Sequence, residues 1–90
     1  MKKKDGYYSF YRLCQENSQH IQELFELFFT KDELEMLGAR YEIIKLLMQG
    51  ELTQREIAQK CKVSIAQITR GSNALKRCKS LNWWALAQNR

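Results

Sequence analysis

Two helix-start signals stand eleven residues apart in this chain and constrain its fold more than any other feature. They occupy residues 53–56 (TQRE) and 64–67 (SIAQ). In each, a hydroxyl at the N-cap can accept the backbone N–H three residues later, and the Glu or Gln side chain there can reach back to the N-cap N–H. The sequence therefore predicts two short helices joined by a tight turn, which is the pattern of a helix-turn-helix that reads DNA.

The remainder of the chain also favours helices, because it contains no proline and only four glycines. A third capping box at 30–33 (TKDE) begins a long helix that we expect to end near Gly50. A core of this size is marginal for a chain of 90 residues, so we expect two chains to form one fold. The predicted fold is all-α, a single domain over 1–90 and an intertwined homodimer, with about six short helices at about 7–15, 19–29, 30–49, 54–60, 65–77 and within 80–88. The dimer core would take in about 7–49 and 80–88, and the helix-turn-helix about 53–77.

Apolar spacing predicts which helix faces are buried. In the long helix, a stripe at 3-4 spacing is wide enough to suggest burial on more than one side, as at a dimer centre. In the helix-turn-helix, Ala58 is small where two helices would cross, and Val63 is expected to face inward. Gly38 lies in the middle of the long helix, where it either permits a close backbone approach or is merely tolerated. The stripe is Leu34, Leu37, Tyr41, Ile44 and Met48, and the core anchors predicted in the last motif helix are Ile65, Ile68 and Leu75.

Charge is distributed unevenly along the chain. Residues 51–90 carry eight basic and two acidic groups, and no Asp or Glu follows Glu56. A block of one sign indicates a polyanionic partner, although it is also compatible with a charged face that only aids solubility. Because a recognition helix presents its first residues to base edges, we predict a DNA-binding set at the starts of both motif helices, with one later lysine near the phosphates. The set is Gln54, Arg55, Ser64, Ile65, Ala66, Gln67, Thr69 and Lys76.

Other classes of protein find little support in the sequence. The three cysteines lack C-x-x-C spacing and His20 stands alone, so no metal site is expected. We find no paired catalytic carboxylates, nucleophile–His pairing or phosphate loop, so we expect neither an enzyme nor a cofactor. No signal peptide and no membrane-spanning run is recognised, and a cytoplasmic protein is expected.

The stretch from Leu37 to Lys76 resembles the tryptophan repressor family. The most specific portions are G-E-L-T-Q-R-E at 50–56 and I-x-x-I-T-R-G-S-N-x-L-K at 65–76. The resemblance implies an all-α, intertwined homodimer that binds L-tryptophan as a corepressor. It also implies double-stranded operator DNA as a partner, with a palindromic site near genes of tryptophan biosynthesis or uptake.

Carried over position by position, the resemblance implies a ligand site between the core and the DNA-reading helices. Arg40 and Arg70 would stack on opposite faces of the indole, and Arg70 would also pair with the carboxylate. Thr30 would help to hold the carboxylate, and backbone carbonyls near Leu27 and Phe29 of the other subunit would receive the ammonium. The implied ligand-binding set is Leu27, Phe29, Thr30, Arg40, Arg70, Gly71 and Ala74.

The sequence also departs from the family pattern. Ala74 stands where better-known members have a serine that touches the ammonium, and Lys62 occupies a turn position that is commonly glycine. A left-handed conformation at Lys62 would cost roughly 1 kcal/mol. The tail is shorter than usual and contains the pair Trp83-Trp84, for which we weigh packing at the dimer periphery against a starvation-sensitive translation signal. Two alternatives stay open: a helix-turn-helix regulator that is constitutive or answers another effector, and a protein-interaction domain on the same scaffold.

Overall fold

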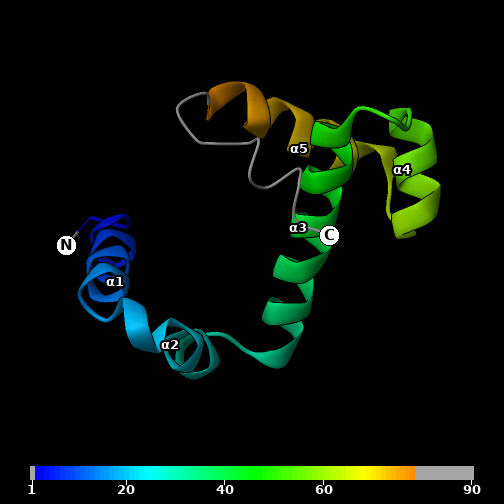
Figure 1. Cartoon of the computed structure of the whole chain (residues 1–90). Helices are drawn as coiled ribbons and strands as arrows, with labels where there is room; N and C mark the ends of the chain where they lie inside the picture. Colours follow the sequence, from blue (N-terminus) through cyan, green and yellow to red (C-terminus); the bar gives the residue numbers. More distant parts are fainter. Residues whose placement is uncertain (1, 79–90) are drawn as a thin grey trace. The chain divides into compact units, whose positions relative to one another are not determined.

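The computed structural model describes residues 2–78, and every regular element in that range is a helix. The all-α prediction is confirmed for this part of the chain. The predicted helix within 80–88 and the Trp83-Trp84 pair lie outside the described residues. The elements in chain order are α1 (Asp5–Glu16), the 3-10 turn η1 (Ser18–His20), α2 (Ile21–Phe28), α3 (Lys31–Gln49), α4 (Gln54–Cys61) and α5 (Ile65–Arg77) (Figure 1).

The chain divides into two compact units, one ending at Glu35 and the other beginning at Met36. In the first unit, an aromatic cluster joins α1 to α2. The Phe10 ring lies 6.0 Å from Phe25, 5.1 Å from Phe28 and 5.7 Å from Phe29, measured between ring centroids. Such tilted and edge-on contacts are favoured geometries for aromatic pairs, so they explain how two short helices hold together. Two predicted boundaries were wrong here: α1 begins at Asp5, and the segment before α2 is a 3-10 turn.

The start and stop of α3 follow the sequence signals. The Thr30 hydroxyl accepts the Glu33 N–H at 3.1 Å, and the Thr30 N–H donates to Glu33 Oε1 at 2.8 Å, which completes the predicted capping box. Gly50 follows the helix with a φ of 69°, and its N–H donates to the Leu46 carbonyl. A left-handed residue of this kind ends a helix at little cost only when it is glycine. A Cβ on Gly38 would meet nothing within 4 Å among the described residues, so no close approach is seen there.

The second unit is built around a small core shared by α3, α4 and α5. Ile57 and Ile68 are fully buried, and Ala58 lies beside them with 6% of its surface exposed. Burying a side chain the size of isoleucine stabilises a fold by roughly 1.5–3 kcal/mol, so these two residues dominate the unit. The predicted roles of Ala58, Val63 and Ile68 are confirmed. The complete core is Ile43, Leu46, Ile57, Ala58 and Ile68, with Leu47, Leu52, Cys61 and Val63 packed against it.

One predicted core anchor, Ile65, was wrong, whereas the α3 stripe, with Ile43 and Leu47 beside it, was predicted to be buried at a dimer centre and stays a prediction. In α3, Leu37 and Tyr41 are 42% and 38% exposed, whereas Ile43 and Leu46 are buried. The reason is that α4 and α5 pack only against the C-terminal part of α3, on the side that Ile43 and Leu46 occupy. Ile65 is 46% exposed, because it lies in the first turn of α5 and Ile68 fills the core position one turn later.

Candidate ligand pocket and DNA-facing helices

The first helix of the motif begins with a complete capping box. The Thr53 hydroxyl accepts the Glu56 N–H at 3.1 Å, and the Thr53 N–H donates to Glu56 Oε1 at 2.8 Å. The Thr53 N–H that donates to the Glu56 carboxylate favours its charged form and is the larger cause of the lowered pKa of Glu56; a side-chain hydrogen bond between Thr53 and that carboxylate is the smaller cause. The first of the two opening signals is therefore confirmed.

The turn between α4 and α5 is left-handed at a residue with a side chain. Lys62 has φ 57° and ψ 46°. The Val63 N–H donates to the Ala58 carbonyl at 3.0 Å and the Lys62 N–H to the Gln59 carbonyl at 3.3 Å. This bond pair is the Schellman motif; Ala58 belongs to the core cluster and Val63 packs against that cluster. The turn thus keeps the geometry that glycine would give, although lysine occupies it.

The capping box predicted at residues 64–67 is only half formed. The Gln67 N–H donates to the Ser64 hydroxyl at 3.3 Å, as predicted. No bond from the Ser64 N–H to the Gln67 side chain occurs among residues 2–78, so the predicted capping box was wrong in this respect. A neutral amide gains less from such a bond than a carboxylate does, and Gln67 is one of the residues that line a pocket between α3 and α5.

The predicted DNA-binding residues are exposed on α4, on α5 and at the N-cap between them. Gln54 and Arg55 begin α4, Ser64 caps α5, and the others follow along α5. Sequence reasoning missed one contact: the Thr69 hydroxyl donates to Gln54 Oε1 at 3.3 Å and so ties the two helices together at their exposed side. No periodic signal points to a bond between residues fifteen positions apart. All eight are exposed: Gln54, Arg55, Ser64, Ile65, Ala66, Gln67, Thr69 and Lys76.

A pocket of about 540 Å³ lies between α3 and α5, inside the second unit. Its volume falls within the ~300–1,000 Å³ that small-molecule sites occupy. Four of the seven residues in the implied ligand set meet there: Arg40, Arg70, Gly71 and Ala74. Their role in binding stays a prediction, but the structure does bring them together. The complete lining is Met36, Ala39, Arg40, Ile43, Ile44, Val63, Gln67, Arg70, Gly71, Ala74 and Arg77.

The pocket combines an apolar wall with positive charge. Ile43, Ile44 and Val63 supply the apolar surface, which suits a ring. Three guanidinium groups line the same space, and the lining contains no Asp or Glu. Gathering like charges is unfavourable until an anion binds, so the pocket is suited to an aromatic anion.

Gly71 sets how closely α5 approaches α3. A Cβ built on it would lie 3.3 Å from Ile43 Cγ2 and 3.4 Å from both Ile44 Cδ1 and Leu47 Cδ1. These separations are tighter than most real contacts, so a side chain would press the isoleucines that form the pocket wall. Gly71 therefore permits close packing of α5 on α3, whereas the role that the resemblance implies, leaving room for the ligand beside α5, stays a prediction.

The other three residues of the implied ligand set belong to the first unit. Leu27 is 75% exposed on α2, and Phe29 packs its ring against Phe10 and Phe25. Thr30 caps α3, where its hydroxyl acts as an acceptor, so the cap leaves its O–H available to donate. The backbone carbonyls expected near Leu27 and Phe29 lie in the segment where α2 gives way to α3.

Comparison with known proteins places this architecture in a family. Residues 9–89 match the family model described as Trp repressor protein. The chain is 52% identical over 75 residues to a Trp operon repressor homolog of Chlamydia trachomatis serovar D, covering 81% of this chain and 80% of that protein. The chain belongs to the Trp repressor family. A homolog from Chlamydia caviae is 48% identical over 75 residues (81% and 74% covered), and one from Vibrio cholerae is 48% identical over 73 residues (81% and 70% covered).

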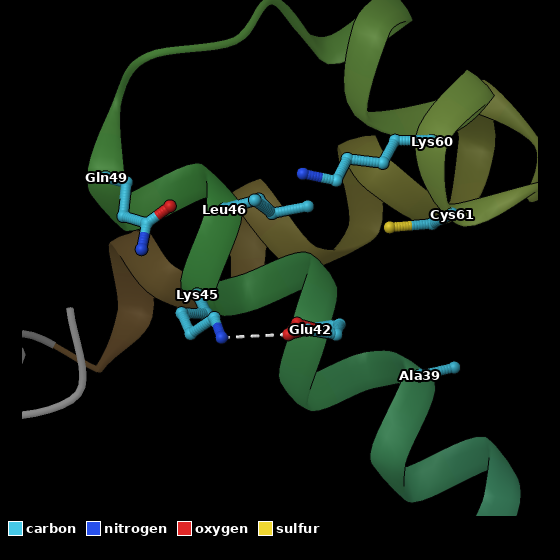
Figure 2. Close-up of a pocket in the computed structure, with 7 residues that line it drawn as sticks. All are labelled: Ala39, Glu42, Lys45, Leu46, Gln49, Lys60 and Cys61. Carbon is cyan, nitrogen blue, oxygen red and sulfur yellow. Dashed lines mark ion pairs between the residues drawn. The ribbon is translucent and has the colours of Figure 1, made fainter. Parts of the chain in front are cut away.

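A second pocket, of about 470 Å³, lies on another side of α3 and contains none of the residues that the Trp repressor resemblance implies. Figure 2 shows Glu42 and Lys45 side by side on α3, with Lys60 and Cys61 coming from α4. Lys45 Nζ lies 2.9 Å from Glu42 Oε1, so one cation there is already paired. The arginines between α3 and α5 form no ion pair within residues 2–78, so that pocket is the candidate ligand site.

Residues 2–78 hold no group of three or more His, Cys, Asp or Glu side chains placed to bind a metal ion. None of the helices described there has the length and apolar character needed to span a bilayer.

Proposed function

We propose that this protein is an L-tryptophan-responsive transcriptional repressor that binds a palindromic operator as a homodimer, near genes of tryptophan biosynthesis or uptake. Gln67 is the observation that carries the proposal, because it lies at the exposed start of α5 and also lines the arginine-rich pocket. A ligand in the pocket therefore touches the helix that would read the DNA. The proposal assigns no catalytic role and places the protein in the cytoplasm, where it would meet the chromosome.

On the ligand side, the indole would lie against Ile43 and Ile44, between the guanidinium planes of Arg40 and Arg70. Stacking of a guanidinium on an aromatic face is worth roughly 0.5–2 kcal/mol. Arg70 would also pair with the carboxylate through a charge-assisted hydrogen bond. The carbonyls near Leu27 and Phe29 of the other subunit would accept hydrogen bonds from the ammonium. Thr30 would make the remaining contact with the carboxylate.

On the DNA side, the exposed first turns of α4 and α5 would enter the major groove. The hydrogen bond between Thr69 and Gln54 would hold the two helices as one reading head. In a dimer, two such heads would reach successive major grooves about 34 Å apart, and a palindromic operator would match their symmetry. L-tryptophan would fix the angle of α5 and so bring both heads into register.

The homodimer in the proposal is supported by the large apolar side chains that a single chain leaves exposed. Leu27 is 75% exposed, Phe28 54%, Met36 50% and Leu37 42%. Side chains of this kind on helices of a small domain indicate that a partner covers them. Light scattering coupled to gel filtration should give twice the mass of 10.7 kDa.

The gating claim is tested by DNA affinity with and without L-tryptophan. Selection from a random duplex library at saturating L-tryptophan would supply the operator, and fluorescence anisotropy at fixed salt would then measure its affinity. We expect the affinity to fall by about 5–150-fold without the ligand, which is the usual size of allosteric coupling. L-leucine, which lacks the ring, should not restore it. Equal affinity in the presence and absence of L-tryptophan would sink the gating claim.

A second test addresses the pocket directly. Arg70→Ala should abolish detectable L-tryptophan binding in calorimetry, because it removes both a stacking plane and the carboxylate partner. Arg55→Ala is the matched control, since Arg55 is an exposed arginine on α4 that does not line the pocket. Intact binding in the Arg70 variant would show that the pocket is misplaced.

Ala74 favours one alternative function. A methyl group in the pocket offers no polar contact to an ammonium, so this chain could be a helix-turn-helix regulator that is constitutive or answers another small effector. Equal operator affinity with and without L-tryptophan would favour that alternative. DNA binding that does not weaken as salt rises would instead favour a protein-interaction domain.

A further inference from the structure

Arg77 belongs to neither the predicted DNA-binding set nor the implied ligand set, yet it lines the pocket between α3 and α5. It is seven residues after Arg70, so the two arginines share one face of α5. Seven residues rise about 10 Å along a helix, and Ala74 lies between them, one turn from each. Sequence reasoning could have found this arrangement from the i, i+4, i+7 spacing of residues 70, 74 and 77.

Three positively charged arginines line the pocket, and a single anionic contact would not neutralise all of them. Arg40, Arg70 and Arg77 make no ion pair with any Asp or Glu among residues 2–78. If Arg40 and Arg70 stack on the two faces of a ring, Arg77 is the guanidinium that stacking does not use. Arg70 and Arg77 line the same pocket from one face of α5, so both can reach an anionic group of the ligand.

We propose that Arg77 is a ligand-binding residue that, together with Arg70, clamps the carboxylate of the small molecule. This inference rests on the proposed function and deepens it, because it names a second carboxylate-binding residue in the same pocket. Two forked guanidinium groups that converge on one carboxylate give directional, charge-assisted hydrogen bonds. The pocket therefore selects aromatic compounds that carry a free carboxylate over neutral analogues of the same shape.

The experiment measures ligand affinity in the absence of DNA. Calorimetry at fixed salt compares the full chain with Arg77→Ala, Arg77→Lys and Lys62→Ala, using L-tryptophan and L-tryptophanamide as probes. The amide keeps the ring and the ammonium but has no carboxylate. We expect Arg77→Ala to raise the Kd of L-tryptophan about tenfold and that of the amide less than twofold. Arg77→Lys should fall between the unchanged chain and the alanine variant, because lysine keeps the charge but not the fork.

Lys62→Ala is the matched control, since Lys62 is an exposed lysine that does not line the pocket, and it should leave both values unchanged. An L-tryptophan Kd within twofold of the unchanged chain in Arg77→Ala would overturn the inference. Equal weakening of L-tryptophan and the amide would also overturn it, because that pattern marks lost packing rather than a carboxylate contact. If the unchanged chain binds no L-tryptophan, the proposed function fails as well, so the two failures are distinguishable.

Discussion

Replacing Lys62 with glycine should stabilise this protein, because the turn between α4 and α5 holds a left-handed backbone at a residue with a Cβ. Its φ of 57° and ψ of 46° lie at the centre of the left-handed region. That conformation costs roughly 1–2 kcal/mol for a residue with a Cβ. Glycine removes this cost but adds about 0.4–1 kcal/mol of unfolded-state entropy. The difference predicts a gain of about 0.5–1 kcal/mol in the free energy of unfolding.

The substitution removes no other stabilising contact. Lys62 is exposed and forms no ion pair within residues 2–78, and both hydrogen bonds of the turn use backbone atoms. Urea unfolding at fixed protein concentration would measure the gain, since the stability of a dimer depends on concentration. Lys62→Ala is the control: it removes the same charge but keeps the Cβ, so its stability should stay within about 0.5 kcal/mol of the starting protein. If the glycine and alanine variants unfold at the same urea concentration, the reasoning about backbone strain is refuted.

Three further predictions concern the core, the cap and the reading head. Ile68→Ala, at a fully buried position, should lower the unfolding free energy by about 2–5 kcal/mol in urea unfolding; a loss under 1 kcal/mol would contradict the core assignment. The pKa of Glu56 is lowered from its ordinary 4.5, so the ionised carboxylate contributes its full stabilisation above pH 4.5. This stabilisation is lost as pH falls through the folded-state pKa. Unfolding of Glu56→Gln followed from pH 6 to pH 3 should therefore show a shallower acid loss than the unchanged chain, and parallel curves would oppose this. Thr69→Val removes the bond to Gln54, so operator affinity measured by anisotropy should fall by up to about tenfold while the Kd of L-tryptophan in calorimetry stays constant.

Local structure was predictable where the signal spans a few residues. The cap pairs Thr30–Glu33 and Thr53–Glu56 depend only on positions three apart, and both formed as expected. The left-handed turn at Lys62 follows from the two helix boundaries on either side of it, whatever residue fills it. Hydrogen bonds between residues close in sequence set the ends of these helices, and they can be predicted without knowing the tertiary contacts.

The buried face of each helix, and the set of side chains that meet in one pocket, were less predictable. Both depend on how the helices pack against one another. The 3-4 stripe through Leu37 and Tyr41 is a real periodicity, but α4 and α5 pack on the neighbouring line of Ile43 and Leu46. Ile65 has the same side chain as Ile68 and lies three residues earlier, yet only the later one reaches the core. Family resemblance supplied Arg40, Arg70, Gly71 and Ala74 as one site, and hydrophobic pattern alone would not have brought α3 and α5 together around them.

The predicted capping box failed at Gln67, which lies in the first turn of α5 and also lines the candidate ligand pocket. The sequence at 64–67 has the form of a capping box, and the Thr53–Glu56 box shows that this chain forms such boxes completely. At Ser64 only the hydroxyl bond formed. A neutral amide gains less from the cap than a carboxylate does, because a hydrogen bond to a charged group is roughly twice as strong. Gln67→Glu should therefore turn the side chain back to the Ser64 N–H, strengthen the cap and uncouple the pocket from the start of α5. Operator affinity in that variant should respond less to L-tryptophan than in the unchanged chain, and an undiminished response in anisotropy titrations would remove Gln67 from the coupling.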